Sequence, residues 1–223
     1  MKYPEHLSIS ALTKYEKCPR CFWLEKIAGF KDKGSPAMAL GSEVHFAIEN
    51  YHRGRDKRHL ISPKAGKLFE VYKDTIKPET IPQTEFKFMV PFENLATGEK
   101  LPFKLKGFVD GIDRKTGWLF EHKTSKRIWK MEDVDSNLQA TAYAYVYYMV
   151  YGELPKGIRF QIIRKLVKPK IQFLETYRTM EDLIYFWNWA NELKKGMDEG
   201  DFEPRETRFN YHHRLCPYYR DRR

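Results

Sequence analysis

The sequence predicts an α/β fold in which a mixed central β-sheet is flanked by helices. Apolar residues recur at helical spacing in the first third of the chain, whereas the middle alternates apolar and polar residues as strands do. No repeat, low-complexity tract or linker rich in Pro, Gly and Ser divides the 223 residues. We therefore expect a single domain over residues 1–223, with a mainly helical N-terminal part.

Start and stop signals place the helices of the first third. Ser8 precedes the segment ALTKYEK, which predicts a capped helix that ends before Pro19. A second helix follows Gly41, because apolar residues there recur at helical spacing. Ser62 and Pro63 fit the cap and the first position of a third helix.

The middle of the chain predicts paired strands. Apolar and polar residues alternate over 84–92 and over 103–113, and the segment NLATGEK between them predicts a hairpin connection. A second turn at 115–117 leads into another strand. Beyond it we expect a long apolar helix capped near Ser136 and stopped by Gly152, then strands at 157–166 and 170–178 and a helix over 180–197.

Composition and charge indicate a folded basic protein. Its 40 basic residues against 30 acidic ones give a net charge of +10, which suggests a polyanionic partner such as nucleic acid. The start MKYPEHLSIS lacks the apolar core of a signal peptide, and no apolar run approaches the length of a membrane span. We therefore expect a soluble cytoplasmic protein with no membrane partner.

The segment GWLFEHKTSKR places an acid and a base in a strand that is otherwise apolar. Side chains alternate along a strand, so Glu121 and Lys123 share one face. If the strands pair through the turn at 115–117, Asp110 lies near Glu121. Two carboxylates held together call for a cation such as Mg²⁺ or Mn²⁺ between them. The alternative is a salt-bridged strand end without chemistry.

Five segments in order resemble the PD-(D/E)XK nuclease superfamily, and within it the RecB-type branch of bacterial recombination helicases and phage exonucleases. They are SISALTKYEKCPRCFWL, GSEVH ending at His45, GFVD ending at Asp110, EHK from Glu121 to Lys123, and QATAY from Gln139 to Tyr143. The chain departs from the superfamily name at Val109, which stands in place of the proline. The resemblance implies a restriction-endonuclease-like core.

The resemblance also implies roles for particular residues. His45, Asp110 and Glu121 would hold one or two divalent ions, and Lys123 would assist catalysis beside the two carboxylates. A neutral imidazole suits Mn²⁺ better than Mg²⁺, so we expect a preference for Mn²⁺. Glu85 could approach the metals, but the sequence alone gives no way to decide.

Two further groups of residues are candidates for contact with DNA. In similar nucleases the residues at Gln139 and Tyr143 sit beside the site and hold the strand, although this helix is rich in Tyr and core packing is the alternative. Lys126 and Arg127 follow the catalytic motif directly and could bind the DNA backbone.

Three cysteines raise the question of a structural metal. Cys18 and Cys21 at one end, with His213 and Cys216 at the other, could bind a structural Zn²⁺; the alternative is buried thiols without metal. Several RecB-type nucleases have an iron-sulfur cluster on four cysteines. We do not expect one here, because Tyr219 stands where a further cysteine would be.

Together these features predict a metal-dependent deoxyribonuclease that hydrolyses phosphodiester bonds. The resemblance implies an exonuclease on single- or double-stranded DNA ends, acting in recombination, repair or phage replication with partners from those processes, in a bacterial or phage-infected cell. No phosphate-binding loop of the ATPase type is present. The alternatives are a nuclease-like module that binds DNA without cutting, a structure-specific endonuclease, and action on RNA.

Overall fold

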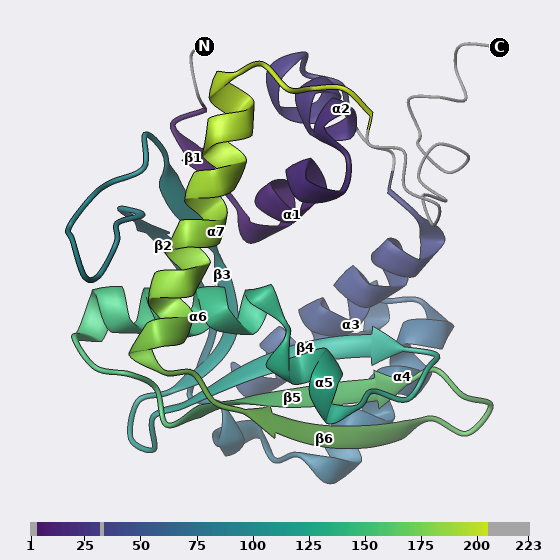
Figure 1. The fold of residues 1–223 in the computed structure, drawn as a ribbon. Coiled ribbons are helices and arrows are strands. Elements are labelled where there is room, and N and C mark those ends of the chain that lie inside the picture. Colours follow the sequence, from purple (N-terminus) through teal and green to yellow (C-terminus); the bar gives the residue numbers. More distant parts are fainter. Residues whose placement is uncertain (1–3, 32–33, 205–223) are drawn as a thin grey trace, which may run out of the picture. The chain divides into compact units, whose positions relative to one another are not determined.

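A computed structural model describes residues 4–31 and 34–204, which Figure 1 draws as a ribbon. These residues form two compact units, each assembled from separate stretches of chain. The described parts of 1–33, 89–107 and 184–223 make up the first unit, and 34–88 with 108–183 make up the second. The single domain over 1–223 stays a prediction.

The first unit is mainly helical and is packed around Tyr15. The Tyr15 side chain is fully buried, its hydroxyl donates to the carbonyl of Asp201 at 2.9 Å, and its ring meets Phe22 and Phe202 edge to face. Ser8 accepts the N–H of Ala11, which confirms the predicted helix cap. The elements here are β1 (His6–Leu7), α1 (Ile9–Lys17), α2 (Pro19–Phe22), the π-helix η1 (Trp23–Ile27) and most of α7 (Met180–Asp198).

The second unit contains most of a mixed sheet. Strand β3 pairs antiparallel with β4, β4 pairs in parallel with β5, and β5 pairs antiparallel with β6. Strand β2 lies on β3 as a side branch. The strands are β2 (Gln83–Val90), β3 (Lys104–Asp113), β4 (Trp118–Ser125), β5 (Gly157–Arg164) and β6 (Lys170–Thr176), of which β2 and β3 continue into the first unit.

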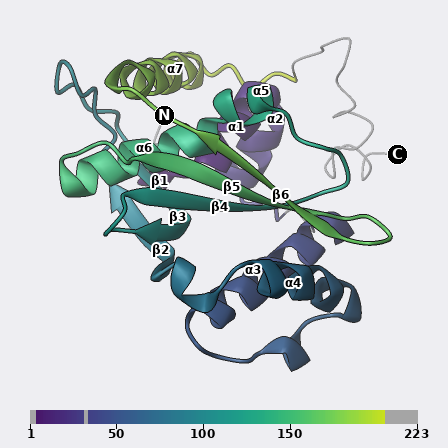
Figure 2. The same ribbon diagram turned by 90° about the horizontal axis from the view of Figure 1, so that it is seen from below.

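Helices cover both faces of this sheet, as Figure 2 shows: α3 and α4 lie on one face, and α5 and α6 lie on the other. Their bounds are α3 (Pro36–His52), α4 (Pro63–Thr75), α5 (Met131–Asp135) and α6 (Leu138–Tyr151), with short 3-10 helices at Arg58–Leu60 (η2) and Pro78–Thr80 (η3). Helices α3 and α4 bury Val44 and Leu68 in one apolar cluster with Ile163 of β5. The predicted mixed sheet flanked by helices is therefore confirmed.

The residues predicted to begin and end helices in this unit lie at or next to the helix ends. Ser62 caps α4 and Pro63 is its first residue. Helix α6 is capped by Asn137, one residue after the expected Ser136, and ends at Gly152 in the left-handed conformation with φ 73°. Every residue of α6 from Ala140 to Tyr147 is buried, which fits the crossover helix between two parallel strands.

Gly111 of β3 lets the two strands of the predicted turn pack closely. A Cβ atom at this position would lie 2.5 Å from Cγ2 of Ile81 and 3.1 Å from Cβ of Phe120. Ile81 and Phe120 belong to one buried cluster with Trp118. A side chain at 111 would therefore clash with Ile81 and Phe120 and disturb this cluster.

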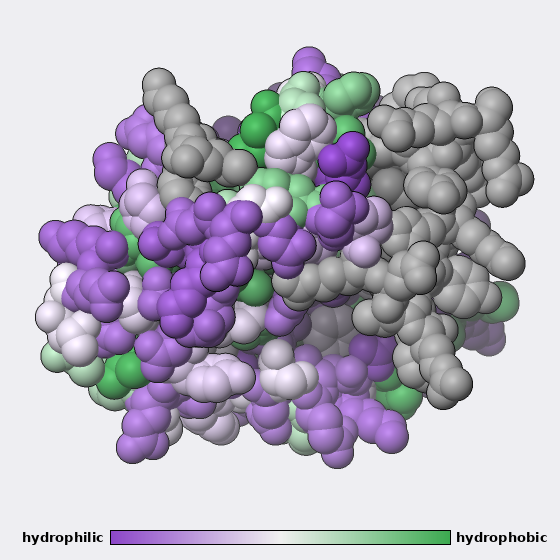
Figure 3. Space-filling model, turned by 45° about the horizontal axis from the view of Figure 1, so that its top comes forward, coloured by the Kyte–Doolittle hydropathy of each residue, from purple (hydrophilic) through white to green (hydrophobic). Residues whose placement is uncertain are grey.

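Among the described residues, no helix is both long and apolar enough to cross a bilayer. The longest, α7, carries Glu181, Asp182 and Lys194 along its length. On the face drawn in Figure 3, hydrophilic side chains predominate and hydrophobic ones form separate patches.

Candidate active site

The candidate site lies in the second unit, where β3 and β4 separate. The last paired residues of these strands are Gly111 and Phe120, so Asp110 and Glu121 come next on the two diverging strands. The turn that joins the strands includes Gly117, whose φ of 75° favours glycine. The structure thus brings Asp110 close to Glu121, as the strand pairing predicted.

Asp110 fills the gap that opens between the strands. Its side chain is almost fully buried, and Oδ2 accepts the backbone N–H of His122 at 2.8 Å. The other oxygen accepts the hydroxyl of Tyr143 at 3.3 Å. These contacts hold the carboxylate between β4 and α6.

His45 approaches the same carboxylate from α3. Its Nε2 lies 3.0 Å from the carbonyl oxygen of His122, and its Nδ1 lies 3.7 Å from Oδ2 of Asp110. A carbonyl only accepts hydrogen bonds, so Nε2 carries a proton. In the neutral ring Nδ1 is then left with a lone pair that faces the carboxylates, as a metal ligand requires.

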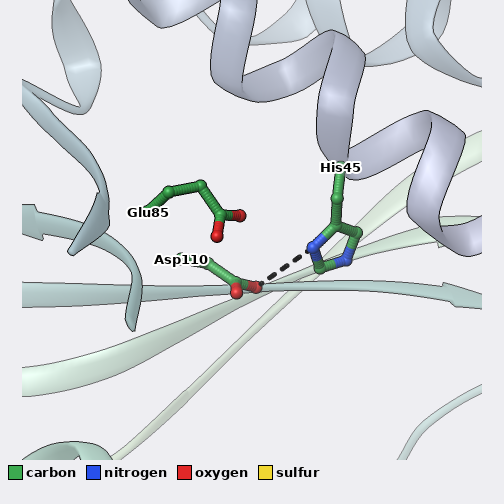
Figure 4. A group of neighbouring side chains, drawn as sticks. All are labelled: His45, Glu85 and Asp110. Carbon is green, nitrogen blue, oxygen red and sulfur yellow. Dashed lines mark ion pairs between the residues drawn. The ribbon is translucent and has the colours of Figure 1, made fainter. Parts of the chain in front are cut away.

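Glu85 completes this group from β2. Figure 4 shows the side chains of His45, Glu85 and Asp110 pointing toward one another. Among the described residues, Glu85 is the only one other than glycine with a positive φ, at 51°. Such a backbone costs energy and turns the carboxylate out of the regular alternation of the strand, a feature that often marks functional sites. Burial raises the pKa of Glu85.

Glu121 and Lys123 share one face of β4, as predicted. The Glu121 carboxylate is fully buried, and burial together with the nearby charge of Asp110 raises its pKa to about 7. Lys123 forms an ion pair with Glu121 that acts against this rise. Burial lowers the pKa of Lys123, but the charges of Glu121 and Asp110 outweigh that effect and raise it, so the amine stays protonated.

Helix α6 links these groups through two side chains. Lys123 donates to Oε1 of Gln139 at 2.7 Å, and Nε2 of Gln139 donates to the hydroxyl of Tyr143 at 2.8 Å. Tyr143 in turn donates to Asp110. The Tyr143 ring is 2% exposed and belongs to the core, so only its hydroxyl reaches the site.

The residues fit a divalent cation. His45, Glu85 and Asp110 each offer one ligand atom, and these atoms lie within 4.8 Å of one another. Apart from the ion pair with Lys123, the oxygens of the buried Glu121 carboxylate have no hydrogen-bond partner among the described residues. Carboxylate oxygens with one imidazole nitrogen are a donor set for Mg²⁺ or Mn²⁺.

The cluster differs from the predicted ligand set in one respect. It contains Glu85, which the sequence left undecided, whereas Glu121 stands beside it and is paired with Lys123. Alternation along a strand gave no signal for Glu85, because its side chain direction depends on an unusual backbone angle. The metal role of Glu121 stays a prediction.

The two basic residues after the motif differ in their surroundings. Arg127 donates to both oxygens of Asp133 at 2.7 Å each and lies over the ring of Trp129. Lys126 is exposed and forms no ion pair with a described residue. Lys126 is therefore more available to a phosphate group than Arg127.

The two cysteines of the first unit are buried in contact with each other. The backbone N–H of Cys21 donates to Sγ of Cys18 at 3.4 Å, which caps α2. The other expected zinc ligands, His213 and Cys216, lie outside the described residues. The zinc site stays a prediction.

Carboxylates, a histidine and a lysine that converge beside a mixed sheet fit the class of metal-dependent nucleases. A sequence profile of the PD-(D/E)XK nuclease superfamily matches residues 6–88 and 64–220. The chain belongs to the PD-(D/E)XK nuclease superfamily, which confirms the resemblance to that superfamily. Membership of the RecB-type branch stays a prediction.

Solved structures share the fold at low sequence identity. A provisionally assigned exonuclease from Eubacterium rectale aligns with a TM-score of 0.64 and 16% identity, over 98% of this chain and 88% of that one. The protein SSO0001 aligns with a TM-score of 0.53 and 16% identity, over 97% of this chain and 85% of that one. No curated protein sequence matches at a significant level.

Proposed function

We propose that this protein is a metal-dependent deoxyribonuclease that removes nucleotides from DNA ends. The observation that carries the proposal is the convergence of His45, Glu85 and Asp110 on one point beside the Glu121–Lys123 pair. Their chemistry suits hydrolysis of a phosphodiester, because the reaction needs positive charge against the phosphate and a way to activate water.

The side chains of His45, Glu85 and Asp110 would hold the cation, with Glu121 as a further oxygen donor. When bound, a divalent cation neutralises phosphate charge and makes water more acidic. His45 presents Nδ1 because its other nitrogen is held by the carbonyl of His122. The imidazole ligand favours Mn²⁺ over Mg²⁺.

Lys123 acts as a cation in this proposal. Its pKa is raised, so it is a poor general base but a suitable partner for the negative charge that develops on a phosphate. Gln139 and Glu121 hold its ammonium group at the mouth of the site. If Glu121 also bound the cation, Gln139 would still hold Lys123 through its side-chain oxygen.

DNA is the proposed substrate because the superfamily acts on nucleic acid and the chain has a net charge of +10. Gln139, Lys126 and Arg127 are proposed to contact the strand; Arg127 would first have to leave Asp133. Tyr143 would act through Asp110, since its ring is buried.

Action on DNA ends is supported by two likenesses. The motifs resemble the RecB-type branch, and the aligned protein from Eubacterium rectale is provisionally assigned as an exonuclease. A place in DNA recombination, repair or phage replication, inside the cytoplasm, follows from the same likeness. Partners from those processes are part of the proposal.

The test is nucleotide release from equal masses of linear and covalently closed DNA, with Mn²⁺, with Mg²⁺ and with chelator. The proposal expects release from linear DNA that depends on metal, is faster with Mn²⁺, and is absent with chelator. Cleavage of closed circles at the same rate would favour an endonuclease, and preferred cleavage of a labelled RNA strand would move the substrate to RNA. Salt-sensitive DNA binding, with no cleavage in the presence of either metal, would favour a module that binds DNA without cutting it.

A further inference from the structure

A cluster of lysines gathers where β4 and β5 end. These neighbouring parallel strands end side by side at Ser125 and Arg164, which are paired in register. The backbone N–H of Lys165 donates to the carbonyl of Ser125 at 2.7 Å, so Lys126 and Lys165 leave the sheet together. Arg164 adds a second link by donating to the carbonyl of Lys126 at 3.3 Å.

Lys64 joins this cluster from the first turn of α4. Its neighbour Ala65 is buried in one apolar cluster with Ile163, two residues before Lys165, so the first turn of α4 lies beside the end of β5. Consistent with this placement, burial and then the charges of Lys126 and Lys64 lower the pKa of Lys165. Lys64 lies in α4, whereas Lys126 and Lys165 directly follow β4 and β5 in the second unit.

Nearby acids do not neutralise the cluster. No described carboxylate forms an ion pair with Lys64, Lys126 or Lys165. The segments KTSKRIWK over 123–130 and RKLVKPK over 164–170 contain no acidic residue. Like charges held together by the fold repel, which costs stability in the free protein and favours a polyanionic ligand.

The cluster continues the strand that carries the catalytic lysine. Lys126 follows Lys123 by three positions, just beyond the end of β4 at Ser125, a span of at most roughly 10 Å at about 3.3 Å per residue. A strand with its scissile phosphate at Lys123 can therefore present a later phosphate to the cluster.

We infer that Lys64, Lys126 and Lys165 form a phosphate-binding subsite that holds the DNA strand to one side of the bond that is cut. The inference rests on the proposed nuclease function for the position of that bond. The cluster holds phosphate groups and takes no part in bond breaking.

A matched pair of variants tests the subsite. Lys126→Ala/Lys165→Ala removes the charges at the ends of β4 and β5. Lys115→Ala/Lys156→Ala removes exposed lysines just before the same two strands begin, so total charge falls equally. Binding of a single-stranded 12-nucleotide DNA is measured without metal between about 50 and 200 mM salt, where phosphate contacts dominate affinity.

We expect the first variant to bind roughly tenfold more weakly and its plot of log affinity against log salt to lose between one and two units of slope. For Lys64→Ala, the slope of log affinity against log salt should fall by up to one unit by the same rule. The control should match the wild type. Equal losses in the two double variants would overturn the subsite, because total charge alone would then explain binding.

Cleavage assays test whether the subsite holds the same DNA strand that is cut. With Mn²⁺, the loss of kcat/KM in Lys126→Ala/Lys165→Ala should be about tenfold greater on the 12-nucleotide strand than on a dinucleotide, which is too short to reach the cluster. Equal losses of kcat/KM on both substrates would contradict the claim that the subsite holds the strand that is cut. If the wild type cleaves neither substrate, the nuclease proposal fails, while the metal-free binding comparison still decides whether the cluster binds phosphate.

Discussion

His45 donates through Nε2 to the carbonyl oxygen of His122 at 3.0 Å. The backbone N–H of His122 donates to Oδ2 of Asp110, so one residue of β4 orients both candidate ligands, His45 and Asp110. The side chain of His122 is buried, and its ring lies edge-on to the rings of Tyr72 and His45. This arrangement explains how ligands from a helix and a strand are held toward one point.

His45→Ala should weaken Mn²⁺ binding by about 10–100-fold, because the imidazole nitrogen and its fixed orientation are both lost. Titration calorimetry with Mn²⁺ on the folded variant measures this. His59→Ala removes an exposed histidine of η2 and serves as control. Equal Mn²⁺ affinities in wild type and His45→Ala would remove His45 from the site.

Glu85→Gly should make the protein more stable and less active. Glycine adopts the observed φ of 51° without strain, so the free energy of unfolding should rise by about 1 kcal/mol while a metal ligand is lost. Urea unfolding without metal and Mn²⁺ titration report the two effects. Glu85→Gln keeps the strain and loses the charge, so it should lose Mn²⁺ affinity without the gain in stability. A less stable Glu85→Gly protein would contradict the strain argument.

Lys123→Met should reduce nucleotide release at least about 100-fold, since the charge beside the phosphate is lost. In metal-free protein it should also lower stability by about 2 kcal/mol, because Glu121 remains buried without its cation. Adding Glu121→Gln should restore part of the stability and none of the activity. Unfolding and release assays on the two variants separate the ion pair from catalysis; recovery of activity in the double variant would count against Lys123.

His52 should make stability depend on pH. Burial lowers its pKa below the ordinary 6.5, although the carbonyl of Pro78 and Glu79 act in the opposite direction. The unfolded chain then binds a proton more readily, so the stability from His52 is complete above about pH 6.5 and is lost as pH falls toward the folded pKa.

Comparison with His52→Gln isolates this contribution, because other titrating groups act equally in both proteins. The wild type should exceed the variant by about 1 kcal/mol at high pH, since His52 bonds to Tyr72 and Pro78. Urea unfolding between about pH 8 and pH 5 should show this gap shrinking on acidification. A gap that widens toward pH 5 would mean that the folded pKa is raised.

Much of the site could be predicted from alternation and turns. The period of β4 placed Glu121 and Lys123 on one face, and the turn before it brought Asp110 alongside. Glu85 could not be predicted, because its direction depends on one left-handed backbone angle. The role of residue 122 could not be predicted either, since it acts through backbone atoms that every sequence shares.

In the fold, too, local features could be predicted from the sequence and long-range contacts could not. Caps at Ser8 and Ser62 and the stop at Gly152 follow local rules and were predictable. Strand β1, with two residues, is too short to carry a period, and its parallel pairing with β3 depends on distant contacts. The approach of Lys64 to Lys165 likewise joins segments that no local pattern relates.

The most direct test of the account is Asp110→Asn, which keeps the shape of the side chain and removes its charge. Nucleotide release from linear DNA with Mn²⁺ should fall at least about 100-fold. Metal-free DNA binding should stay at or above the wild-type level, because a negative charge near the phosphates is gone. Wild-type release by a folded Asp110→Asn protein would contradict the account, since the carboxylate at the centre of the proposed metal site would then be dispensable.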